Sequence, residues 1–252
     1  MYRSIIIMFV VILFSTTFSL CGQPAFENPL FIFTENGKVL VKVENKFLRE
    51  YTIPATVEKI GKNAFSGCMN LVSIKIPDSV KSIAPFAFFG CTNSGINIPA
   101  SVTHIGECAF NQVKYISIAP ENENYWIDSD GLLISNNGIL IYTPPSIKEY
   151  YVMPDTVKKI GFGAFAHNHK LKTIVISDSV NVIAQRAFST CSNLQTVIIS
   201  DSVTKIEKNA FFACKSLKII TVPEKFSEAE IKKWGVPKSC KIIRTLKAIT
   251  TQ

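Results

Sequence analysis

Residues 177–199 read SDSVNVIAQRAFSTCSNLQTVII, and residues 200–222 continue with SDSVTKIEKNAFFACKSLKIITV. Both follow one frame, S/T-V-x-x-I-x-x-x-A-F-x-x-C-x-x-L, which closes on a run of apolar residues. Self-similarity at a period of about 23 residues is typical of a solenoid, in which a unit buries its apolar face only by stacking on its neighbours. The sequence therefore predicts a repeat array.

The same frame occurs four more times on the N-terminal side of this stretch. Residues 53–76, 77–98 and 153–176 form units, and residues 99–118 form a shortened one. An Ala-Phe pair marks each of the six copies, at residues 64–65, 87–88, 109–110, 164–165, 187–188 and 210–211. Chance or an ordinary amphipathic helix would not produce this spacing, so one repeated unit accounts for most of the chain.

Each unit predicts two short extended segments and a tight turn. Near the end of the first unit, Leu71, Ile74 and Ile76 indicate a strand with one buried face. The Pro-Asp-Ser that follows turns the chain. A second extended segment is anchored by apolar residues such as Val80, and a short helical turn is expected around the Ala-Phe pair at residues 87–88. The phenylalanine would fill the space between the layers.

This frame resembles the BspA-like leucine-rich repeats of surface proteins from anaerobic bacteria and parasitic protists. The resemblance covers residues 53–222 and extends into the interruption at residues 119–152, with its N-x-N-Y and D-G-L-L segments. It implies an α/β repeat solenoid, a right-handed array of short strands and short helical turns. It also implies a surface protein that functions in adhesion or as an antigen.

The remaining segments predict an insertion and two caps. Asp130-Gly131 and Asn137-Gly138 are turn dipeptides between apolar runs, so residues 119–152 are expected to form a β-hairpin insertion between arrays at 53–118 and 153–222. Residues 22–52 form an N-terminal β cap with a turn at Asn36-Gly37. In the C-terminal cap, residues 223–252, Ser227 and Glu230 predict a capped helix to Trp234, and residues 241–243 predict a last strand.

The N-terminus has the order of a secretory signal. Arg3 precedes an apolar run from Ile5 to Phe14, and small and polar residues lead to a cleavage position after Cys21. We therefore expect residues 1–21 to be a signal peptide, with no transmembrane anchor after its removal and a secreted or cell-surface location. An uncleaved anchor is the alternative.

Composition excludes some classes of protein. The 252 residues are 47% hydrophobic and 18% charged, which argues against disorder. The net charge of +8 comes from dispersed lysines, which permits attraction to anionic glycans but does not favour nucleic-acid binding.

The cysteines occupy a repeated position. Equivalent places in the units hold Cys68, Cys91, Asn168, Cys191 and Cys214, which predicts a structural ladder of buried side chains bonded to the backbone. Cys108 stands outside this ladder, and a Cys214–Cys240 disulfide is an alternative. His167 and His169 are interpreted as solvated loop residues, and Asp128 and Asp130 as parts of a hairpin turn. We expect no metal, no cofactor and no catalytic residue.

Function is expected on the outward positions of the longer strands. These residues are Ser73, Lys75, Asn97, Tyr115, Ser117, Thr173, Val175, Thr196, Ile198, Ile219 and Thr221. They change from polar to Thr, Val and Ile toward the C-terminus, which is typical either of a protein-binding patch or of a solvated sheet. We expect a non-enzymatic protein that binds extracellular or host proteins. The alternative is a structural scaffold that self-associates.

Overall fold

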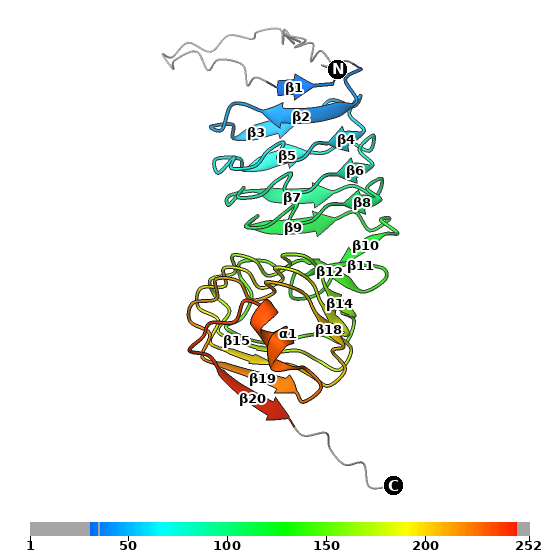
Figure 1. Cartoon of the computed structure of the whole chain (residues 1–252). Helices are drawn as coiled ribbons and strands as arrows, with labels where there is room; N and C mark the ends of the chain where they lie inside the picture. Colours follow the sequence, from blue (N-terminus) through cyan, green and yellow to red (C-terminus); the bar gives the residue numbers. More distant parts are fainter. Residues whose placement is uncertain (1–30, 35, 246–252) are drawn as a thin grey trace, which may run out of the picture.

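The computed structural model describes residues 31–34 and 36–245, which form a β-solenoid of stacked coils (Figure 1). The described part contains strands β1 to β20 and one short helix, α1. The expected repeat solenoid is confirmed. The signal peptide and its cleavage position fall outside the described residues, as does Cys21.

The longer strand of each coil contributes to a parallel column, here called the main sheet. The main sheet consists of two sets of strands. The first is β3 (Glu50–Thr52), β5 (Ser73–Lys75), β7 (Gly95–Ile98) and β9 (Tyr115–Ile118). The second is β13 (Tyr150–Val152), β15 (Thr173–Val175), β17 (Thr196–Ile198), β19 (Ile219–Pro223) and β20 (Lys241–Thr245).

The Val-x-x-Ile segment of each unit forms a two-residue strand in a second column, here called the side sheet. Its parallel strands are β4 (Lys59–Ile60), β6 (Ser82–Ile83), β8 (His104–Ile105), β14 (Lys159–Ile160), β16 (Val182–Ile183) and β18 (Lys205–Ile206). It is extended by β1 (Phe31–Phe33) and β2 (Val39–Val43) at the N-terminal end, and by β10 (Tyr125–Ile127), β11 (Leu133–Ser135) and β12 (Ile139–Tyr142) in the interruption. Strands β2 and β12 pair parallel with β4 and β14, and the remaining pairs of these extensions are antiparallel.

The α/β description is not confirmed, because the segments around the Ala-Phe pairs are tight turns and not helical turns. In each of these turns, two residues have a positive φ. The first position holds Asn63, Phe86, Cys108, Gly163, Arg186 and Asn209, and the second holds Gly67, Gly90, Gln112, His167, Thr190 and Ala213. Left-handed residues at this spacing prevent helix formation.

The physical reason lies in the hydrogen bonds between coils. The Phe65 N–H donates to Ala87 O at 2.7 Å and the Gly67 N–H to Phe89 O at 2.8 Å, so these groups bond to the next coil and not within a helix. The same pattern joins the other turns of each half. We call this stack of turns the turn column, and it makes a third wall of the solenoid beside the two sheets.

The phenylalanines of the Ala-Phe pairs fill the core between the layers, as the sequence predicts, and their rings form two stacks there. Ring centroids of Phe65 and Phe88 lie 5.0 Å apart, and those of Phe88 and Phe110 lie 5.7 Å apart. In the C-terminal half the corresponding separations along Phe165, Phe188 and Phe211 are 4.9 and 5.3 Å. All six rings are essentially inaccessible to solvent. Offset stacking of aromatic rings adds stabilisation to that from their buried area.

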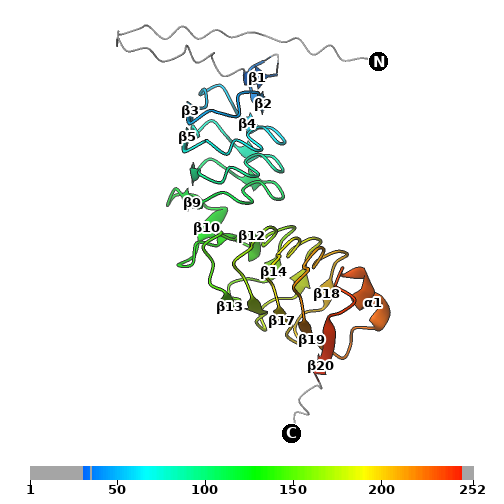
Figure 2. The ribbon, with the colours of Figure 1, turned by 90° about the vertical axis from the view of Figure 1, so that its left-hand side faces the viewer.

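The core and the turn column are both interrupted between the two halves. The buried residues divide into one cluster that ends near Tyr142 and another that begins at Leu132. No described backbone N–H of residues 108–113 donates to the next turn at residues 163–168. The solenoid axis changes direction at this point, which we call the junction (Figure 2).

Side chains hold the junction in place of the backbone ladder. Asn111 Nδ2 donates to Gly163 O at 2.8 Å, and Cys108 Sγ lies 3.8 Å from Phe162 O. The predicted hairpins form here, and Asp128 Oδ1 accepts the N–H groups of Asp130 and Leu132, as a turn requires.

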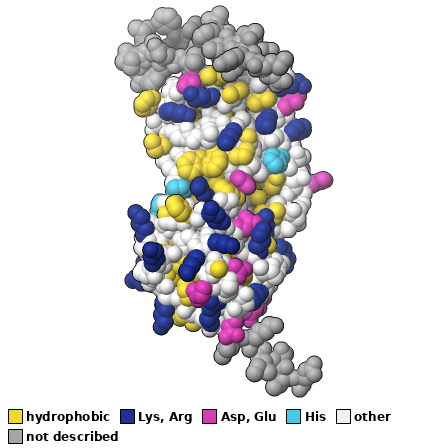
Figure 3. All heavy atoms as spheres, in the orientation of Figure 1, with side chains coloured by type: hydrophobic (Ala, Val, Ile, Leu, Met, Phe, Trp, Pro, Cys, Tyr) yellow, Lys and Arg dark blue, Asp and Glu magenta, His cyan; other side chains and the backbone are white. Residues whose placement is uncertain are grey.

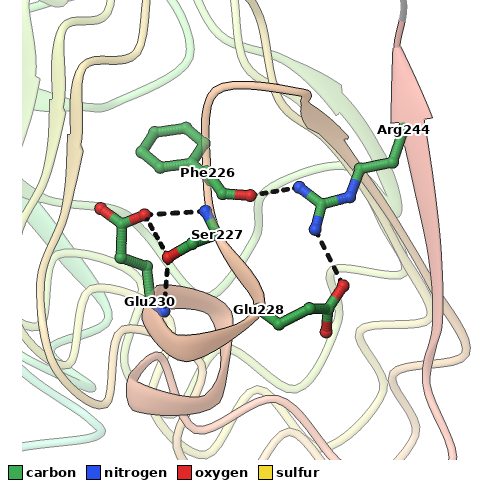
Figure 4. A network of polar contacts seen from close by, with 5 residues as sticks. All are labelled: Phe226, Ser227, Glu228, Glu230 and Arg244. Carbon is green, nitrogen blue, oxygen red and sulfur yellow. Dashed lines mark hydrogen bonds and ion pairs between the residues drawn. The ribbon is translucent and has the colours of Figure 1, made fainter.

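Helix α1 (Glu228–Lys233) closes the C-terminal end of the turn column. Ser227 and Glu230 form the expected reciprocal capping box, drawn in Figure 4. The Phe211 N–H donates to Trp234 O at 2.8 Å, so the end of the helix replaces a further turn. Arg244 of β20 donates to Phe226 O and pairs with Glu228 at 2.8 Å, which joins the last strand to the helix.

Candidate protein-binding face

The outward residues of the second set of main-sheet strands form two aligned columns. The register places Tyr150, Thr173, Thr196, Ile219 and Lys241 in one column. The other column holds Val152, Val175, Ile198, Thr221 and Ile243. Neighbouring members stand about 4.8 Å apart, the spacing of hydrogen-bonded strands. We call these ten residues the C-terminal face.

All residues of the second column except Thr221 are apolar, and Val152, Ile198 and Ile243 are accessible to solvent. Val152 is 51% exposed, and Ile198 and Ile243 are each 38% exposed. Tyr150, in the first column, is 60% exposed. Isolated apolar residues on a surface are ordinary, whereas an aligned run of them is typical of an interaction site.

The N-terminal set of strands carries a different surface. Its outward residues include Glu50, Ser73, Lys75, Asn97 and Ser117, and Ser117 Oγ donates to Asn97 Oδ1 at 3.0 Å. The exception is Tyr115, which is 57% exposed. A Cβ built on the neighbouring Gly95 would overlap the Tyr115 ring, so this ring lies flat across the glycine. The aliphatic outward residues are therefore confined to the C-terminal set of strands.

Charged residues border the C-terminal face on both sides. Exposed lysines precede the strands at Lys172 and Lys218. Exposed carboxylates follow the strands at Asp155, Asp178, Asp201 and Glu224. Among these residues only Lys172 forms an ion pair within the described part of the chain, with Glu149 at 2.9 Å. The face is thus an apolar strip between a basic and an acidic border.

Figure 3 shows how hydrophobic and charged side chains are spread over one side of the molecule. On the side drawn there, hydrophobic side chains gather near the middle of the molecule, and Lys and Arg side chains are spread over the lower, C-terminal half.

The structure places every predicted outward residue on an outer strand position, although Thr173, Val175, Thr196, Ile219 and Thr221 are only half-exposed. Sequence reasoning missed Tyr150, Val152 and Ile243, which continue the same columns. The sequence does contain a signal for this strand, because Tyr150-Tyr-Val152 has the alternating pattern of a repeat strand. These residues fall within the predicted interruption, residues 119–152, so the pattern alone does not place them in the main sheet.

The residues of the predicted Cys/Asn ladder contact the backbone of the preceding coil. The thiols of Cys91, Cys191 and Cys214 each lie 3.0–3.2 Å from the phenylalanine carbonyl of the preceding coil. Asn168 donates to Pro144 O and accepts two backbone N–H groups, and Lys46 Nζ lies 3.9 Å from Cys68 Sγ. Burial raises the pKa of Cys91 to about 12, so this thiol is unreactive at neutral pH.

The structure also bears on the Cys214–Cys240 disulfide, the two histidines and a metal site. Cys214 and Cys240 are both free thiols, so they form no disulfide. Both histidines lie in the predicted loop and His169 is exposed, whereas His167 is half-buried against Phe89, with ring centroids 5.6 Å apart, so it is less solvated than the sequence predicts. Within residues 31–34 and 36–245, no group of three His, Cys, Asp or Glu residues could hold a metal ion.

A cavity of about 240 Å³ opens at the junction. It is lined by Glu107 from the N-terminal half and by Gln185 and Glu207 from the C-terminal half. The Glu207 carboxylate pairs with Lys205 at 2.9 Å and accepts the Gln185 N–H at 2.9 Å. These contacts lower the pKa of Glu207, Lys205 having the largest effect, and satisfy its charge within the protein.

The stacked parallel coils and the repeated apolar frame define a solenoid of the leucine-rich-repeat class. The chain belongs to the family described as BspA type leucine rich repeat region, whose model matches residues 43–129 and 144–246 in 6 copies. The family resemblance predicted from the repeat frame is therefore confirmed. No curated protein matches the sequence.

Two solved structures show the same fold. A leucine rich cell surface protein from Faecalibacterium prausnitzii A2-165 is 25% identical, with a TM-score of 0.59 over 80% of this chain and 61% of that chain. The pneumococcal vaccine antigen PcpA is 22% identical, with a TM-score of 0.58 over 79% of this chain and 63% of that chain. The present chain thus spans about three fifths of either protein.

Helix α1 has 6 residues, and no helix in the described part of the chain is long and apolar enough to span a bilayer.

Proposed function

We propose that this protein is a secreted or surface-associated, non-catalytic binding protein that contacts another protein through the C-terminal face. The observation that carries the proposal is the aligned column of Val152, Val175, Ile198, Thr221 and Ile243, in which every residue except Thr221 is apolar. Apolar residues on a rigid sheet bind without a large entropic cost, because the sheet is ordered before the partner arrives. Membership of a leucine-rich-repeat family supports protein binding.

The charged borders favour a partner with an apolar strip between residues of opposite charge. An acidic patch on the partner would face Lys172 and Lys218, and a basic patch would face Asp178 and Asp201. Such complementarity selects the partner and its orientation more than it adds affinity. Extracellular or host proteins are the proposed class of ligand, and adhesion is the proposed role. Anionic glycans could be attracted by the excess of lysine.

The proposed location has two supports. The first is the signal-like sequence of residues 1–21. The second is the cell-surface description of the similar F. prausnitzii protein. Expression in a bacterial host followed by N-terminal sequencing of the exported protein tests it, and a new N-terminus after Cys21 is the expected result. Retention of Met1 on an exported, membrane-bound protein would favour the uncleaved anchor.

Binding is tested with a triple variant, Val175→Asp, Ile198→Asp and Thr221→Asp. Immobilised extracellular-matrix proteins and whole cells are the probes, and binding is measured across a salt series. We expect saturable binding that survives about 0.15 M salt, where the Debye length is about 8 Å, and that is lost in the variant. The matched control replaces Ser73, Asn97 and Ser117 with Asp on the polar half of the same sheet and should retain binding.

Two results would refute the proposal. One is binding that only tracks ionic strength, which is expected from dispersed lysines alone. The other is equal loss in the triple variant and the control, which would remove the assignment to the C-terminal face. Circular dichroism of both variants verifies that the outward substitutions leave the fold intact.

A further inference from the structure

Both ends of the main sheet present a strand with an open edge. Strand β3 is the first of its set and pairs only with β5, while β20 is the last of its set and pairs only with β19. No described strand covers the outer edge of either. An open edge carries a row of unpaired N–H and C=O groups and is a template for another strand.

The inward side chains at these two ends are less buried than their equivalents inside the array. Ile74, Val197 and Ile220 occupy inward positions in the interior and are 0–6% exposed. Tyr51 of β3 and Ile242 of β20 occupy the same positions at the ends and are only partly buried. The Tyr51 ring is stacked on Phe31 of β1 with centroids 3.9 Å apart, so a further strand would add mainly to the burial of Ile242.

The outward residues of the two end strands have opposite charge. In the register that all neighbouring coils share, β20 would place Lys241 beside Glu50 of an added β3, and Ile243 beside Thr52. Antiparallel contact between two β20 edges centred on Ile242 would place each Lys241 opposite Ile243, and contact between two β3 edges would place each Glu50 opposite Thr52. Only the head-to-tail contact brings Lys241 and Glu50 together, and opposite charges on adjacent strands stabilise pairing, so the ends favour each other.

The edge of β20 is long enough to pair along all of β3, since β20 has 5 residues and β3 has 3. The Arg244 guanidinium is directed onto Phe226 O and the Glu228 carboxylate, which holds this side chain against the helix α1 cap and leaves the backbone of β20 free for pairing (Figure 4). Both strands are parallel to their neighbours, so an added coil would continue the sheet in the same direction.

We propose that the partner of these edges is a second copy of this chain, joined head to tail by pairing of β20 of one copy with β3 of the next. Such a contact is heterologous and does not close on itself, so it produces short chains whose length grows with protein concentration. The pairing surface is small, which makes the association weak and reversible. The inference rests on strand edges, although Lys241 and Ile243 of β20 also belong to the C-terminal face. Glu50 and Thr52 of β3 lie outside that face, so variants at these two residues separate this inference from the proposed function.

The test is sedimentation velocity of the purified protein at increasing concentration. We expect the average mass to rise with concentration for the wild-type protein. Lys241→Glu and Glu50→Lys should each weaken association by about tenfold, since each turns an exposed attractive pair into a repulsive one. An equimolar mixture of the two variants should regain association, because every contact in an alternating chain again joins opposite charges. Lys75→Glu, on the interior strand β5, is the matched control and should behave as wild type.

A second variant blocks the backbone edge itself. Thr52→Pro removes an N–H on the outer side of β3, whereas the inner bond from Ile53 N–H to Lys75 O stays. We expect the Thr52→Pro variant to remain monomeric. The control is Thr52→Val, which keeps the backbone N–H and should associate as the wild-type protein does. A single monomeric species for the wild-type protein at all concentrations would overturn the proposal. A mixture of charge variants that fails to regain association would do the same, even if Thr52→Pro does not fold.

Discussion

Phe211 and Phe212 are neighbours in the sequence but have opposite environments. Phe211 is fully buried in the C-terminal stack, 5.3 Å from Phe188, whereas Phe212 is 49% exposed. The difference arises because the turn alternates the direction of successive side chains. The Ala-Phe frame identifies the buried member, and burial gives the two residues very different weights in stability.

This contrast gives a first prediction. Phe211→Ala should lower the free energy of unfolding by about 3–5 kcal/mol, since it removes apolar contact and leaves a cavity in the stack. Phe212→Ala should change it by less than about 0.5 kcal/mol, as is usual for surface substitutions. Urea denaturation followed by circular dichroism measures both. Equal effects of the two substitutions would contradict the assignment of the stack as the centre of the core.

A second prediction at the residue scale concerns His167. Its ring lies between Phe89 and His169, and burial, with a smaller effect from His169, lowers its pKa below the ordinary value of 6.5. The folded state then binds fewer protons than the unfolded chain, so stability falls as the pH drops below about 6.5. The loss is complete below the folded-state pKa.

His167→Gln should therefore reduce the decline in stability between about pH 7 and pH 5. Thermal unfolding at several pH values measures this decline. His104→Gln removes an exposed histidine from β8 and serves as the control. A pH profile that is the same with and without His167 would show that its burial does not contribute.

At the scale of the element, the tight turn is the part of the repeat that sequence patterns describe least well. Its left-handed positions include Arg186, Thr190 and Ala213, none of which favours a positive φ by itself. The conformation is imposed by hydrogen bonds to adjacent coils, such as Thr190 N–H to Phe212 O at 2.8 Å. A helical turn would leave those groups of the neighbouring coil without partners.

The turn at the junction depends on a glycine, which gives a third prediction. A Cβ on Gly163, whose φ is +61°, would overlap Cys108 Sγ, and this contact lies where the backbone ladder is interrupted. Gly163→Ala should cost about 2–3 kcal/mol, of which about 1 kcal/mol reflects the left-handed conformation. Adding Cys108→Ala should recover the steric part. Denaturant titration of the two single variants and the double variant measures the coupling.

Gly67→Ala is the matched control for the comparison of Gly163→Ala, Cys108→Ala and the double variant. Gly67 has a φ of +75°, and nothing lies within 4 Å of a Cβ built on it. The Gly67→Ala variant should therefore lose only about 1 kcal/mol of unfolding free energy, which is the cost of the left-handed conformation. If Gly163→Ala costs no more than Gly67→Ala, the Cys108 contact does not constrain the junction.

At the scale of the whole molecule, the solenoid consists of two stacks joined by side chains. The buried residues form two clusters, and the turn ladder stops at the junction. In a repeat array, stability is close to a sum of units and nearest-neighbour contacts. The weakest neighbour contact is expected to divide the molecule into separately unfolding parts.

Hydrogen exchange followed by mass spectrometry tests this division. Phe211→Ala should accelerate amide exchange in the coils that follow the junction and leave exchange in residues 53–118 unchanged. Phe88→Ala should have the reciprocal effect. Acceleration over the whole described chain by either variant would show that the two stacks unfold as one unit.

The sequence by itself determined the repeat period, the buried phenylalanines, the hairpin turns and the capped helix. These features depend on local chemistry or on a pattern repeated six times, as with the Ser227–Glu230 capping box. It could not determine the left-handed turns, the alignment of Val152 and Ile243 with the C-terminal face, or the open edges of β3 and β20. Only the tertiary structure decided these, because each depends on which coil lies beside another, and on the backbone groups that the neighbouring coil supplies or leaves unpaired.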